Sequence, residues 1–374
     1  MVNKMAVIEK IKDFCKKEVV LVIALIAAII SCFFMPIDKE YLNYFDYTTL
    51  ACLFCMLAVV AGLKSTGFFD YISRKLISLF HHRRTVIYAL VFGTFFFDMI
   101  VANDMSLITF LPLTYIVLHK TKNDKYLAIT FILQTIAANM GGMITPYGNP
   151  QNLYLYSYYN IPTSEFYGVL LTESIAVAVM LIIAGLFIKN EPLELAQDVK
   201  LKINKEELYI YLVLFVFVIL SIFRVIPYFI TLLVTIITLL IINRKILKNV
   251  DYALLATFCV FFIFSGNIAR IPIIKEIIES IVKVSTLAAG LVSCQFISNV
   301  PTAIFLSKFT SNYQDLLVSV NIGSLGIIIS SLASLITLKE YLKHQPKKLW
   351  SYLGIFTVVN LSFLIIILII NSLH

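Results

Sequence analysis

Long apolar runs separated by short polar segments make up most of the chain from Val19 onward. The runs that approach or exceed the length of a bilayer crossing are 19–35, 47–63, 166–188, 208–223, 226–242, 250–266 and 353–370. About 20 apolar residues suffice for a crossing helix. The apolar positions are continuous and do not alternate with polar ones, which favours helices over the strands of a membrane barrel. The chain is therefore predicted to be an all-α polytopic membrane protein.

Two further segments are too long, and too polar in the middle, to be single straight helices. Residues 85–118 have a polar tip at 102–104 and basic residues beyond both ends. Because basic loops mark the cytoplasmic side of a membrane, this segment is expected to enter and leave the bilayer on that side. Residues 285–310 repeat the pattern around a polar tip at 298–299. Both segments are predicted to form re-entrant helical hairpins, whose tips must lie in protein or line a wet cavity.

Two other long segments are predicted to be broken transmembrane helices. Residues 126–158 are interrupted by glycines and prolines between 141 and 150, and residues 314–338 by glycines and serines. Glycine permits unwound backbone, and proline removes a hydrogen-bond donor. With each broken helix counted as one span, the pattern predicts about nine spans plus two hairpins. Short amphipathic segments at 68–84 and 268–283 are expected to lie at the membrane interface.

The same order of elements occurs twice along the chain. Each half has two spans, an amphipathic segment, a hairpin, a broken helix and a final span. Residues 139–153 align without gaps with residues 321–335, which places Asn139 opposite Asn321. An extra span before the second half reverses its orientation, so two inverted repeats are predicted, an architecture typical of secondary transporters. The predicted division is 1–188 for the first repeat, 189–225 for a cytoplasmic linker and connecting span, and 226–374 for the second repeat.

Composition supports a membrane protein and removes other classes. Of the 374 residues, 60% are apolar and 14% are charged, whereas soluble domains have about 45–50% apolar and about a quarter charged residues. The mean hydropathy is +0.91. These values exclude a soluble globular, disordered or collagen-like chain. The net charge of +8 belongs mostly to predicted cytoplasmic loops, so it indicates orientation rather than a nucleic-acid surface.

The basic loops predict a multi-pass protein of the plasma membrane with a cytoplasmic N-terminus. We expect the lipid bilayer and a small anionic substrate as partners and no nucleic acid; a homodimer is left open. Cys52 and Cys55 have redox or metal spacing, but they lie inside an apolar run, which favours buried packing. We expect no enzymatic activity, no catalytic residue, no metal centre and no cofactor.

The breaks in the helices are the predicted binding site. Half-helix N-termini carry partial positive charge and suit anions, whereas half-helix C-termini and loop carbonyls suit cations. Asparagine side chains offer neutral donors and acceptors beside them. The predicted substrate- and ion-binding residues are Asn103, Asp104, Gly141, Gly142, Thr145, Gly148, Asn149, Asn152, Ser298, Asn299, Thr302, Asn321, Gly323 and Ser324.

Asp104 is the ionisable residue with the strongest functional claim. A carboxylate near the bilayer centre costs roughly 2.5–3.5 kcal/mol and usually faces a pathway or a partner. In the alternative reading, Asp104 caps a helix that begins at Met105, and the two roles are compatible. Asp98 has a weaker claim to a functional role. A membrane hydrolase that uses these two carboxyls is disfavoured, because they are six residues apart and are not helix neighbours.

At these positions the chain resembles the ion transporter superfamily, which includes divalent anion/sodium symporters, citrate–metal symporters, arsenite permeases and a class of sodium/proton antiporters. The motifs that carry the resemblance are ANDMSLITFLPLTY (102–115), NMGGMITPYGNPQNLYLY (139–156), SNVPTAIFLSKFT (298–310) and VNIGSLGIIISSLASLI (320–336). The dicarboxylate branch has Ser-Asn-Thr at each hairpin tip, and Asn103 and Asn299 match its asparagines. The first tip here, Ala-Asn-Asp, is more similar to the arsenite-permease and citrate–metal branches. The resemblance also implies an elevator-type motion of the hairpin domain.

The resulting functional expectation is a secondary active transporter of a small anion, a carboxylate or an inorganic oxyanion, coupled to sodium or protons. Asp104 is expected to supply charge for the coupling. A cation/proton antiporter or an arsenite-type efflux permease on the same fold is the alternative. A passive channel is disfavoured, because inverted broken helices are typical of carriers.

Overall fold

The computed structural model describes residues 9, 14, 18–101, 103–193 and 203–372. In that part of the chain the regular structure is helical, apart from one isolated bridge between His82 and Pro192. The long helices are α2 (Val19–Phe34), α3 (Tyr47–Ser65), α4 (Phe68–Ser78), α5 (Arg83–Asp98), α6 (Asn103–Lys120), α7 (Leu127–Gly141), α8 (Pro150–Tyr158), α9 (Thr163–Leu186), α10 (Lys205–Ile222), α11 (Tyr228–Asn243), α12 (Tyr252–Ala269), α13 (Pro272–Val284), α14 (Thr286–Ile297), α15 (Asn299–Leu306), α16 (Tyr313–Ile322), α17 (Leu332–His344) and α18 (Leu349–Asn371). The all-α prediction is confirmed.

Five helical segments within the described residues are long and apolar enough to cross a membrane: α3, α7 with its flanking 3₁₀ turns, α9, α12, and α18 with the turn before it. The pair α13–α14, bent by 116°, meets the same requirement as one unit. The predicted spans at 19–35 and 226–242 form helices of 16 residues, α2 and α11, which fall short by length alone. The second broken segment is divided between α16 and α17. The predicted total of about nine spans counts these shorter pieces as well.

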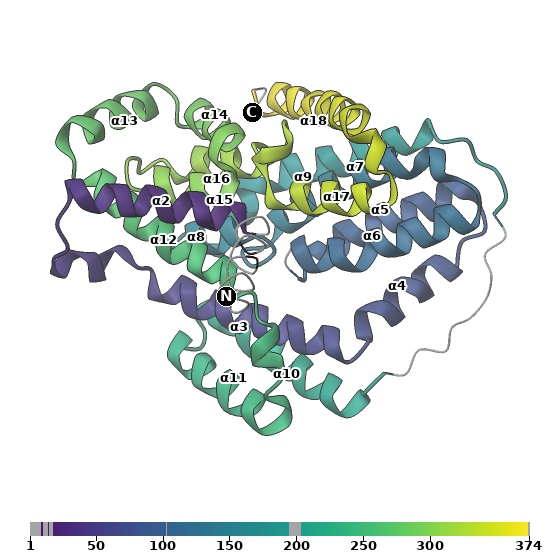
Figure 1. The fold of residues 1–374 in the computed structure, drawn as a ribbon, viewed down its shortest axis with the longest axis horizontal. Helices are drawn as coiled ribbons and strands as arrows, with labels where there is room; N and C mark the ends of the chain where they lie inside the picture. The colour runs from purple at the N-terminus through teal and green to yellow at the C-terminus, as the bar shows by residue number, and fades with distance from the viewer. Residues whose placement is uncertain (1–8, 10–13, 15–17, 102, 194–202, 373–374) are drawn as a thin grey trace.

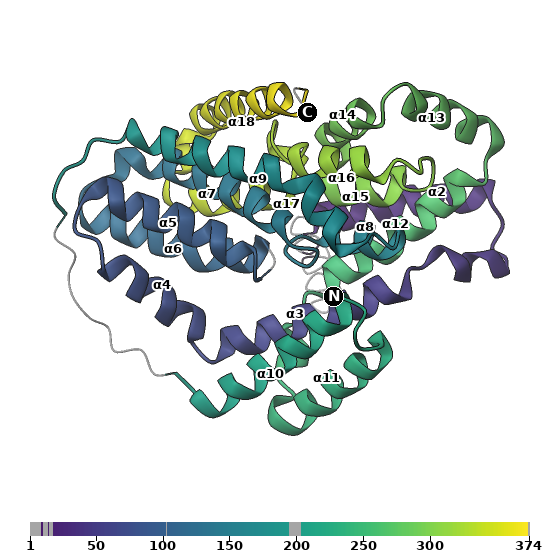
Figure 2. The same cartoon turned by 180° about the vertical axis from the view of Figure 1, so that it is seen from behind.

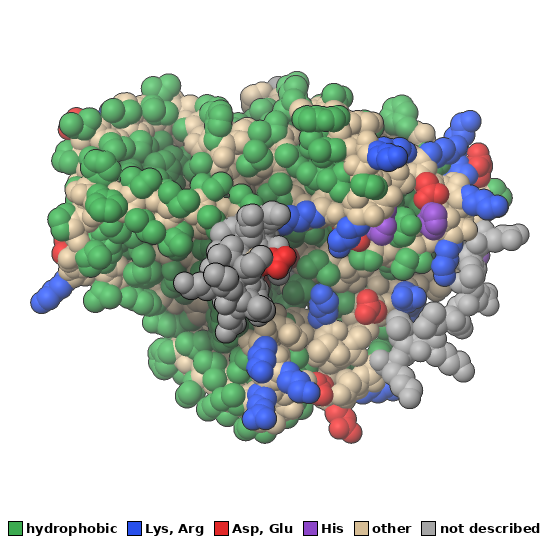
Figure 3. All heavy atoms as spheres, in the orientation of Figure 1, with side chains coloured by type: hydrophobic (Ala, Val, Ile, Leu, Met, Phe, Trp, Pro, Cys, Tyr) green, Lys and Arg blue, Asp and Glu red, His purple; other side chains and the backbone are tan. Residues whose placement is uncertain are grey.

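The apolar helices differ in what covers them. The α7 segment is 83% buried inside the protein, whereas the α9 and α18 segments are 33% and 28% buried. Figure 3 shows apolar side chains spread over the upper and left parts of one face, with charged side chains gathered toward the right and the lower edge. A surface of exposed isoleucines, leucines and phenylalanines is what lipid contact requires. α7 is therefore a core helix, and α9 and α18 present apolar surface to the bilayer.

The helices form two groups (Figures 1 and 2). α3 packs against α10 and α11 in the lower group, and α2 packs lengthwise against α12. The upper group contains α5 to α9 and α14 to α18. Within it, α17 packs on α6 and α7, and α15 packs on α8. Elements from the two ends of the chain therefore interlock around the breaks.

The breaks occur where the sequence predicts them. α7 ends at Gly141 and α8 begins at Pro150, while α16 ends at Ile322 and α17 begins at Leu332. Positions 150 and 332 differ by 182, the same offset that places Asn139 opposite Asn321 in the sequence alignment. The second halves of both broken segments thus begin at aligned positions. Inversion of the two repeats stays a prediction.

Each predicted hairpin segment contains two consecutive helices that pack against each other. α5 is followed by α6, and α14 is followed by α15. A single residue, Ser298, joins the second pair with a φ of +71°, a conformation that side-chain-bearing residues rarely adopt. Asn103 and Asn299 are the first residues of α6 and α15 respectively. The two predicted tips thus share one register, and their re-entry into a membrane stays a prediction.

Candidate functional site

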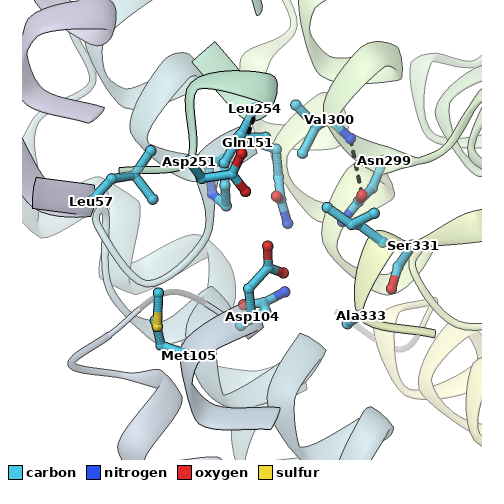
Figure 4. Close-up of a pocket in the computed structure, with 13 residues that line it drawn as sticks. Leu57, Asp104, Met105, Gln151, Asp251, Leu254, Asn299, Val300, Ser331 and Ala333 are labelled. Atoms are coloured by element: carbon cyan, nitrogen blue, oxygen red, sulfur yellow. Dashed lines mark hydrogen bonds between the residues drawn. The ribbon is translucent and has the colours of Figure 1, made fainter. Parts of the chain in front are cut away.

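The first residues of several helices meet at one small pocket (Figure 4). The first turns of α6, α8, α15 and α17 contribute to it, and Asp251 and Leu254 contribute from the start of α12. The pocket has a volume of about 50 Å³. Its lining residues are Leu57, Asn103, Asp104, Met105, Pro150, Gln151, Asp251, Leu254, Asn299, Val300, Ser331, Leu332 and Ala333. The breaks in the chain therefore converge on one space.

Local sequence explains why helices start here. Ser331 precedes α17, and its Oγ accepts a hydrogen bond from the backbone N–H of Ser334 at 3.2 Å. Pro150 opens α8 at a position where the missing N–H costs nothing. Asn299 Oδ1 accepts from the backbone N–H of Val300 at 3.0 Å. Each helix N-terminus carries about half a positive charge, so the four at the breaks supply roughly +2.

A network of amide side chains ties the two broken helices together. Asn321 Nδ2 donates to Asn152 Oδ1 at 2.7 Å, and Gln151 Nε2 donates to Asn321 Oδ1 at 3.3 Å. Asn152 Nδ2 in turn donates to the backbone carbonyls of Gly142 at 3.4 Å and Met143 at 3.2 Å. These carbonyls lack helical partners because the helix has ended. The network thus fixes the unwound backbone of the first break against the end of α16.

Asn139 connects the first hairpin segment with both breaks. Its Oδ1 accepts from Asn103 Nδ2 at 3.4 Å and from Ser331 Oγ at 3.0 Å. Its backbone carbonyl accepts from Asn149 Nδ2 at 3.0 Å. Asn139 is 1% exposed, and it is the acceptor in all three of these hydrogen bonds, while its Nδ2 donor has no partner. A donor is therefore available beside the pocket.

A pair of unpartnered oxygens lies over Gly142. A Cβ placed on Gly142 would be 2.3 Å from Asp98 Oδ2 and 2.3 Å from Asn149 Oδ1. The two oxygens therefore cannot be farther apart than twice that distance. Neither has a hydrogen-bond partner at normal geometry, although the backbone N–H of Gly142 lies close enough to interact with the Asp98 carboxylate. The other oxygen of the Asp98 carboxylate accepts from Ser106 Oγ at 2.6 Å. Asp98 is fully buried at the end of α5, where a free carboxylate oxygen is costly without a cation or proton.

Four of the unpartnered buried atoms around the pocket are acceptors: Asp98 Oδ2, Asn103 Oδ1, Asn149 Oδ1 and Gln151 Oε1. Buried polar atoms in proteins are nearly always paired, so each of these needs an explanation. A bound cation would satisfy acceptors, whereas the helix N-termini offer donors to an anion. The arrangement suits a small anion beside a cation.

Three of the predicted site residues line the pocket: Asn103, Asp104 and Asn299. The capping interpretation of Asp104 is wrong in register, because α6 begins at Asn103 rather than at Met105. Asp104 therefore lies inside the first turn of α6. An acidic side chain in a first turn is favourable beside the helix dipole, and it leaves the carboxylate directed into the pocket (Figure 4).

The remaining predicted residues shape the backbone around the pocket. Gly141 allows α7 to approach α5, since a Cβ there would be 2.2 Å from the Phe95 carbonyl oxygen. A Cβ added to Gly148 would similarly lie 2.4 Å from the carbonyl oxygen of Gly142. Thr145 Oγ1 donates to the Met99 carbonyl at 2.9 Å. These contacts hold the first break close to the end of α5.

Residues around the second break have comparable roles. Ser298 Oγ donates to the Ser330 carbonyl at 3.4 Å, and Thr302 Oγ1 donates to the Ser298 carbonyl at 2.7 Å. Ser324 Oγ donates to the Asn321 carbonyl at 2.5 Å. Gly323 packs against Cys294, whose Sγ would lie 3.0 Å from an added Cβ. These side chains join the tip between α14 and α15 to the break but do not line the pocket.

Four residues of this region were absent from the sequence prediction: Asn139, Gln151, Asp251 and Ser331. The first two lie inside or beside the motif at 139–153, so their polarity at the break was a usable signal. Ser331 aligns with Asn149 at the offset of 182, and both immediately precede a second half-helix. Asp251 offered no such signal, because an aspartate before an apolar run is an ordinary helix start.

Comparison with known proteins gives a consistent result. A family model described as citrate transporter matches residues 5–323. The chain is 32% identical over 303 residues to an uncharacterized transporter of Methanocaldococcus jannaschii, covering 80% of this chain and 82% of that protein. It is 23% identical over 312 residues to the inner membrane protein YbiR of Escherichia coli, covering 82% of this chain and 83% of YbiR. A stretch of 126 residues, 33% of this chain and 14% of its relative, is 29% identical to the P protein of Mus musculus.

The resemblance to the ion transporter superfamily is thereby confirmed. The apolar helices and these relatives identify a multi-pass membrane transporter. The match over residues 5–323 establishes that the chain belongs to the citrate transporter family.

Proposed function

We propose that the protein is a secondary active transporter of a small anion, coupled to sodium or protons. The observation that carries this proposal is the convergence of four helix N-termini on one pocket, at breaks contributed by both halves of the chain. Unpaired backbone N–H groups at helix starts are ready anion ligands. Discontinuous helices that meet at a shared site are the architecture of secondary transporters.

The size of the pocket bears on the substrate class. At about 50 Å³ it is smaller than the ~150 Å³ cavity that holds benzene in an engineered protein. In this conformation it accommodates a single carboxylate or a small oxyanion. A larger polycarboxylate would require the wall formed by Leu57 and Leu254 to move away. The description of the family as citrate transporters supports a carboxylate.

Asp98, Asn149 and Gly142 support a coupling-cation site beside the pocket. The two unpartnered oxygens over Gly142 are hard ligands of the kind that sodium prefers, and protonation of Asp98 would satisfy the same carboxylate. The equivalent position in the second half, five residues before Asn299 as Asp98 is before Asn103, is Cys294. A thiol is a poor ligand for a hard cation. The proposed site therefore belongs to the first half only.

Transport into proteoliposomes tests the proposal. Citrate, succinate, sulfate and arsenite would be supplied under an imposed sodium gradient and, separately, under an imposed pH gradient. At least one anion is expected to accumulate against its gradient. If none of the four responds to either gradient, the coupled-transport proposal is wrong.

Site variants sharpen this test. Asn103→Ala and Asn299→Ala are each expected to reduce uptake strongly, because both residues start a helix at the pocket. Asn360→Ala is the matched control: Asn360 is also a buried asparagine, but its Nδ2 donates within α18, to the Phe356 carbonyl at 2.9 Å. Full uptake by both site variants would contradict the assignment of the pocket.

Cation/proton antiport, or efflux of arsenite, is the second candidate. In the part of the chain that the structure describes, the pocket lining contains two acidic residues, Asp104 and Asp251, and no basic one. This composition favours a cation over a bare anion. Proton-coupled sodium flux in vesicles without any added anion, abolished by Asp104→Asn, would favour antiport. Dependence of sodium flux on citrate or another panel anion would favour symport.

We also propose a plasma-membrane location with a cytoplasmic N-terminus, from the positive-inside rule. The basic segment at 244–248 and the linker around 189–207 lie on the same side under this proposal. A single cysteine introduced at Lys248 is then expected to react with an impermeant maleimide only in inside-out vesicles, and one at Asn160 only in right-side-out vesicles. The opposite pattern would reverse the orientation.

A further inference from the structure

Two carboxylates from distant parts of the chain face each other across the pocket. Asp104 lies in the first turn of α6, and Asp251 immediately precedes α12. Figure 4 shows both carboxylates directed into the same space, with Gln151 beside Asp251. Asp251 Oδ1 accepts from the backbone N–H of Leu254 at 3.0 Å, which fixes the carboxylate at the helix start. Asp251 thus brings a charge from the start of α12 to a pocket formed mainly by the upper group.

The surroundings of this pair are acidic or acceptor-rich. Glu18, before α2, and Asp98, at the end of α5, interact electrostatically with Asp104. Among the described residues that line the pocket, none is basic. Two further lining residues contribute unpartnered acceptors: Asn103 Oδ1 and Gln151 Oε1, on side chains that are 8% and 1% exposed. Gln151 points toward the pocket beside Asp251 (Figure 4), and these buried acceptors around the pocket suit a positively charged occupant.

The charges in the pocket come close to cancelling. The four helix N-termini at the breaks supply roughly +2, and Asp104 and Asp251 together supply −2 when both are ionised. An anion entering this pocket gains little net attraction. Once the pair is neutralised, the field of the N-termini is left to bind the anion. The order of binding follows from this balance.

We propose that a cation held between Asp104 and Asp251 must neutralise this pair before the anion binds. The proposal rests on the transport function proposed above. This cation position is separate from the one proposed at Asp98 and Asn149, and Asp251 contributes to it from outside the hairpin segments. Sodium and a proton are the two cations considered, since either removes the repulsion between the carboxylates. Anion affinity is thereby linked to the cation through the pocket itself, by the reciprocity that governs coupled binding.

Replacement of Asp251 by asparagine imitates the neutralised pair. Asparagine caps helices as well as aspartate does, so α12 keeps its start. Asp251→Asn is therefore expected to raise anion affinity at pH 8 without sodium, instead of lowering it. A residue with only a structural role would not produce a gain. Asp46→Asn is the control for the loss of a helix-start carboxylate, because Asp46 caps α3 by accepting from the Thr49 N–H at 2.9 Å and does not line the pocket. Asp46 also accepts from the hydroxyls of Thr49 at 2.9 Å and Ser157 at 3.3 Å, so this control is compared in its dependence on pH and sodium.

The first measurement needs no anion. The thermal unfolding midpoint of the purified full-length protein would be recorded at pH 6 and pH 8, in sodium chloride and in choline chloride. In choline at pH 8, the midpoint of Asp251→Asn is expected to be about 2 °C or more above that of the wild type, because the two like charges no longer repel each other. Acidification or sodium should raise the midpoint of the wild type more than that of the variant. If acidification does so, the cation is a proton, and if sodium chloride does so, it is sodium. The midpoint of Asp46→Asn should respond to pH and to sodium as that of the wild type does. If the midpoint of Asp251→Asn responds to pH and sodium in the same way as that of Asp46→Asn across the four conditions, the proposal is wrong.

The second measurement adds citrate, with sulfate as an inorganic alternative. In the wild type, binding is expected to strengthen about tenfold on lowering the pH or adding sodium; in Asp251→Asn it should already be strong at pH 8 in choline. Equal cation dependence in both proteins overturns the proposal while leaving anion transport intact. Failure of both anions to bind under any condition counts against the proposed transport function, and the first measurement still decides the role of the carboxylate pair.

Discussion

The tightest geometric constraint near the proposed coupling site is at Gly142, and a single methyl group tests it. The backbone of Gly142 has φ −64° and ψ −19°, a conformation that alanine adopts readily. Gly142→Ala therefore introduces no backbone strain. Its Cβ would lie 2.3 Å from both Asp98 Oδ2 and Asn149 Oδ1, so the substitution acts only on the space between these oxygens.

The size of the effect can be worked out from these contacts. Ordinary contacts of a Cβ begin at 3.4 Å, so each oxygen must retreat by about 1 Å. Overpacking of this kind costs about 1–3 kcal/mol, and the stiffer unfolded chain returns about 0.4–1 kcal/mol. The net loss of stability is expected to be modest. Displacement of two ligands by this amount should have a larger effect on function: the affinity for the cation is expected to fall by about tenfold or more. A 1 Å misplacement of functional groups can lower activity by about a hundredfold.

The assay is the sodium and pH dependence of uptake, combined with thermal unfolding of the purified protein. Gly168→Ala is the matched control, because Gly168 lies within α9 and nothing is within 4 Å of its added Cβ. That variant should be as stable as the wild type or more stable, with unchanged cation dependence. If Gly142→Ala has the wild-type apparent affinity for sodium and for protons, then Asp98 and Asn149 do not bind the coupling cation.

Three further substitutions test the framework around the pocket. Asn321→Leu leaves the side-chain oxygen Asn152 Oδ1 without its 2.7 Å partner, and a loss of about 1–3 kcal/mol in the free energy of unfolding is expected in chemical denaturation. Asp38→Asn should lower the thermal midpoint slightly at pH 7; because the Arg270 guanidinium lowers the pKa of Asp38 below 3.8, the wild-type advantage should disappear as the pH falls through that lowered pKa. Gly290→Ala places a Cβ 2.0 Å from a serine hydroxyl of α16, and it should destabilise the protein by about 1–3 kcal/mol. An unchanged midpoint in any of the three would contradict the packing on which it depends.

The positions of the breaks were predictable because they depend on local chemistry. Glycine ends α7 at position 141, and proline starts α8 at position 150, each for backbone reasons that hold in any surroundings. The polar residues at 103 and 299 interrupt apolar runs, and both start a helix in the structure. Hydrophobic periodicity could not place the start of α6 to within two residues, since helix ends are its least reliable output. That error changed the reading of Asp104 from a cap to a first-turn residue.

The tertiary partners of the pocket and of the second break were not predictable from local chemistry. Asp251 and Gln295 illustrate why. The first has the pattern of an ordinary helix start, and its position opposite Asp104 depends on how α12 packs against the upper helix group. The second lies in an apolar stretch, yet its side chain satisfies the second break: Gln295 Nε2 donates to the Gly323 carbonyl at 2.9 Å and to the Leu325 carbonyl at 3.1 Å. Both roles depend on tertiary contacts that a single sequence does not specify.

The two halves match in backbone but differ in the side chains that would bind a cation. Both second half-helices begin at the same aligned position, so each half contributes N-terminal charge to the pocket in the same way. Five residues before the tip asparagine, however, the first half has Asp98 and the second has Cys294. An anion site assembled from helix ends needs the repeated backbone and tolerates unlike side chains. A cation site needs particular oxygens, so one half can lose it while the fold remains intact. The asymmetry between Asp98 and Cys294 is therefore the feature in which we expect this carrier to differ from relatives with a carboxylate or hydroxyl at both positions.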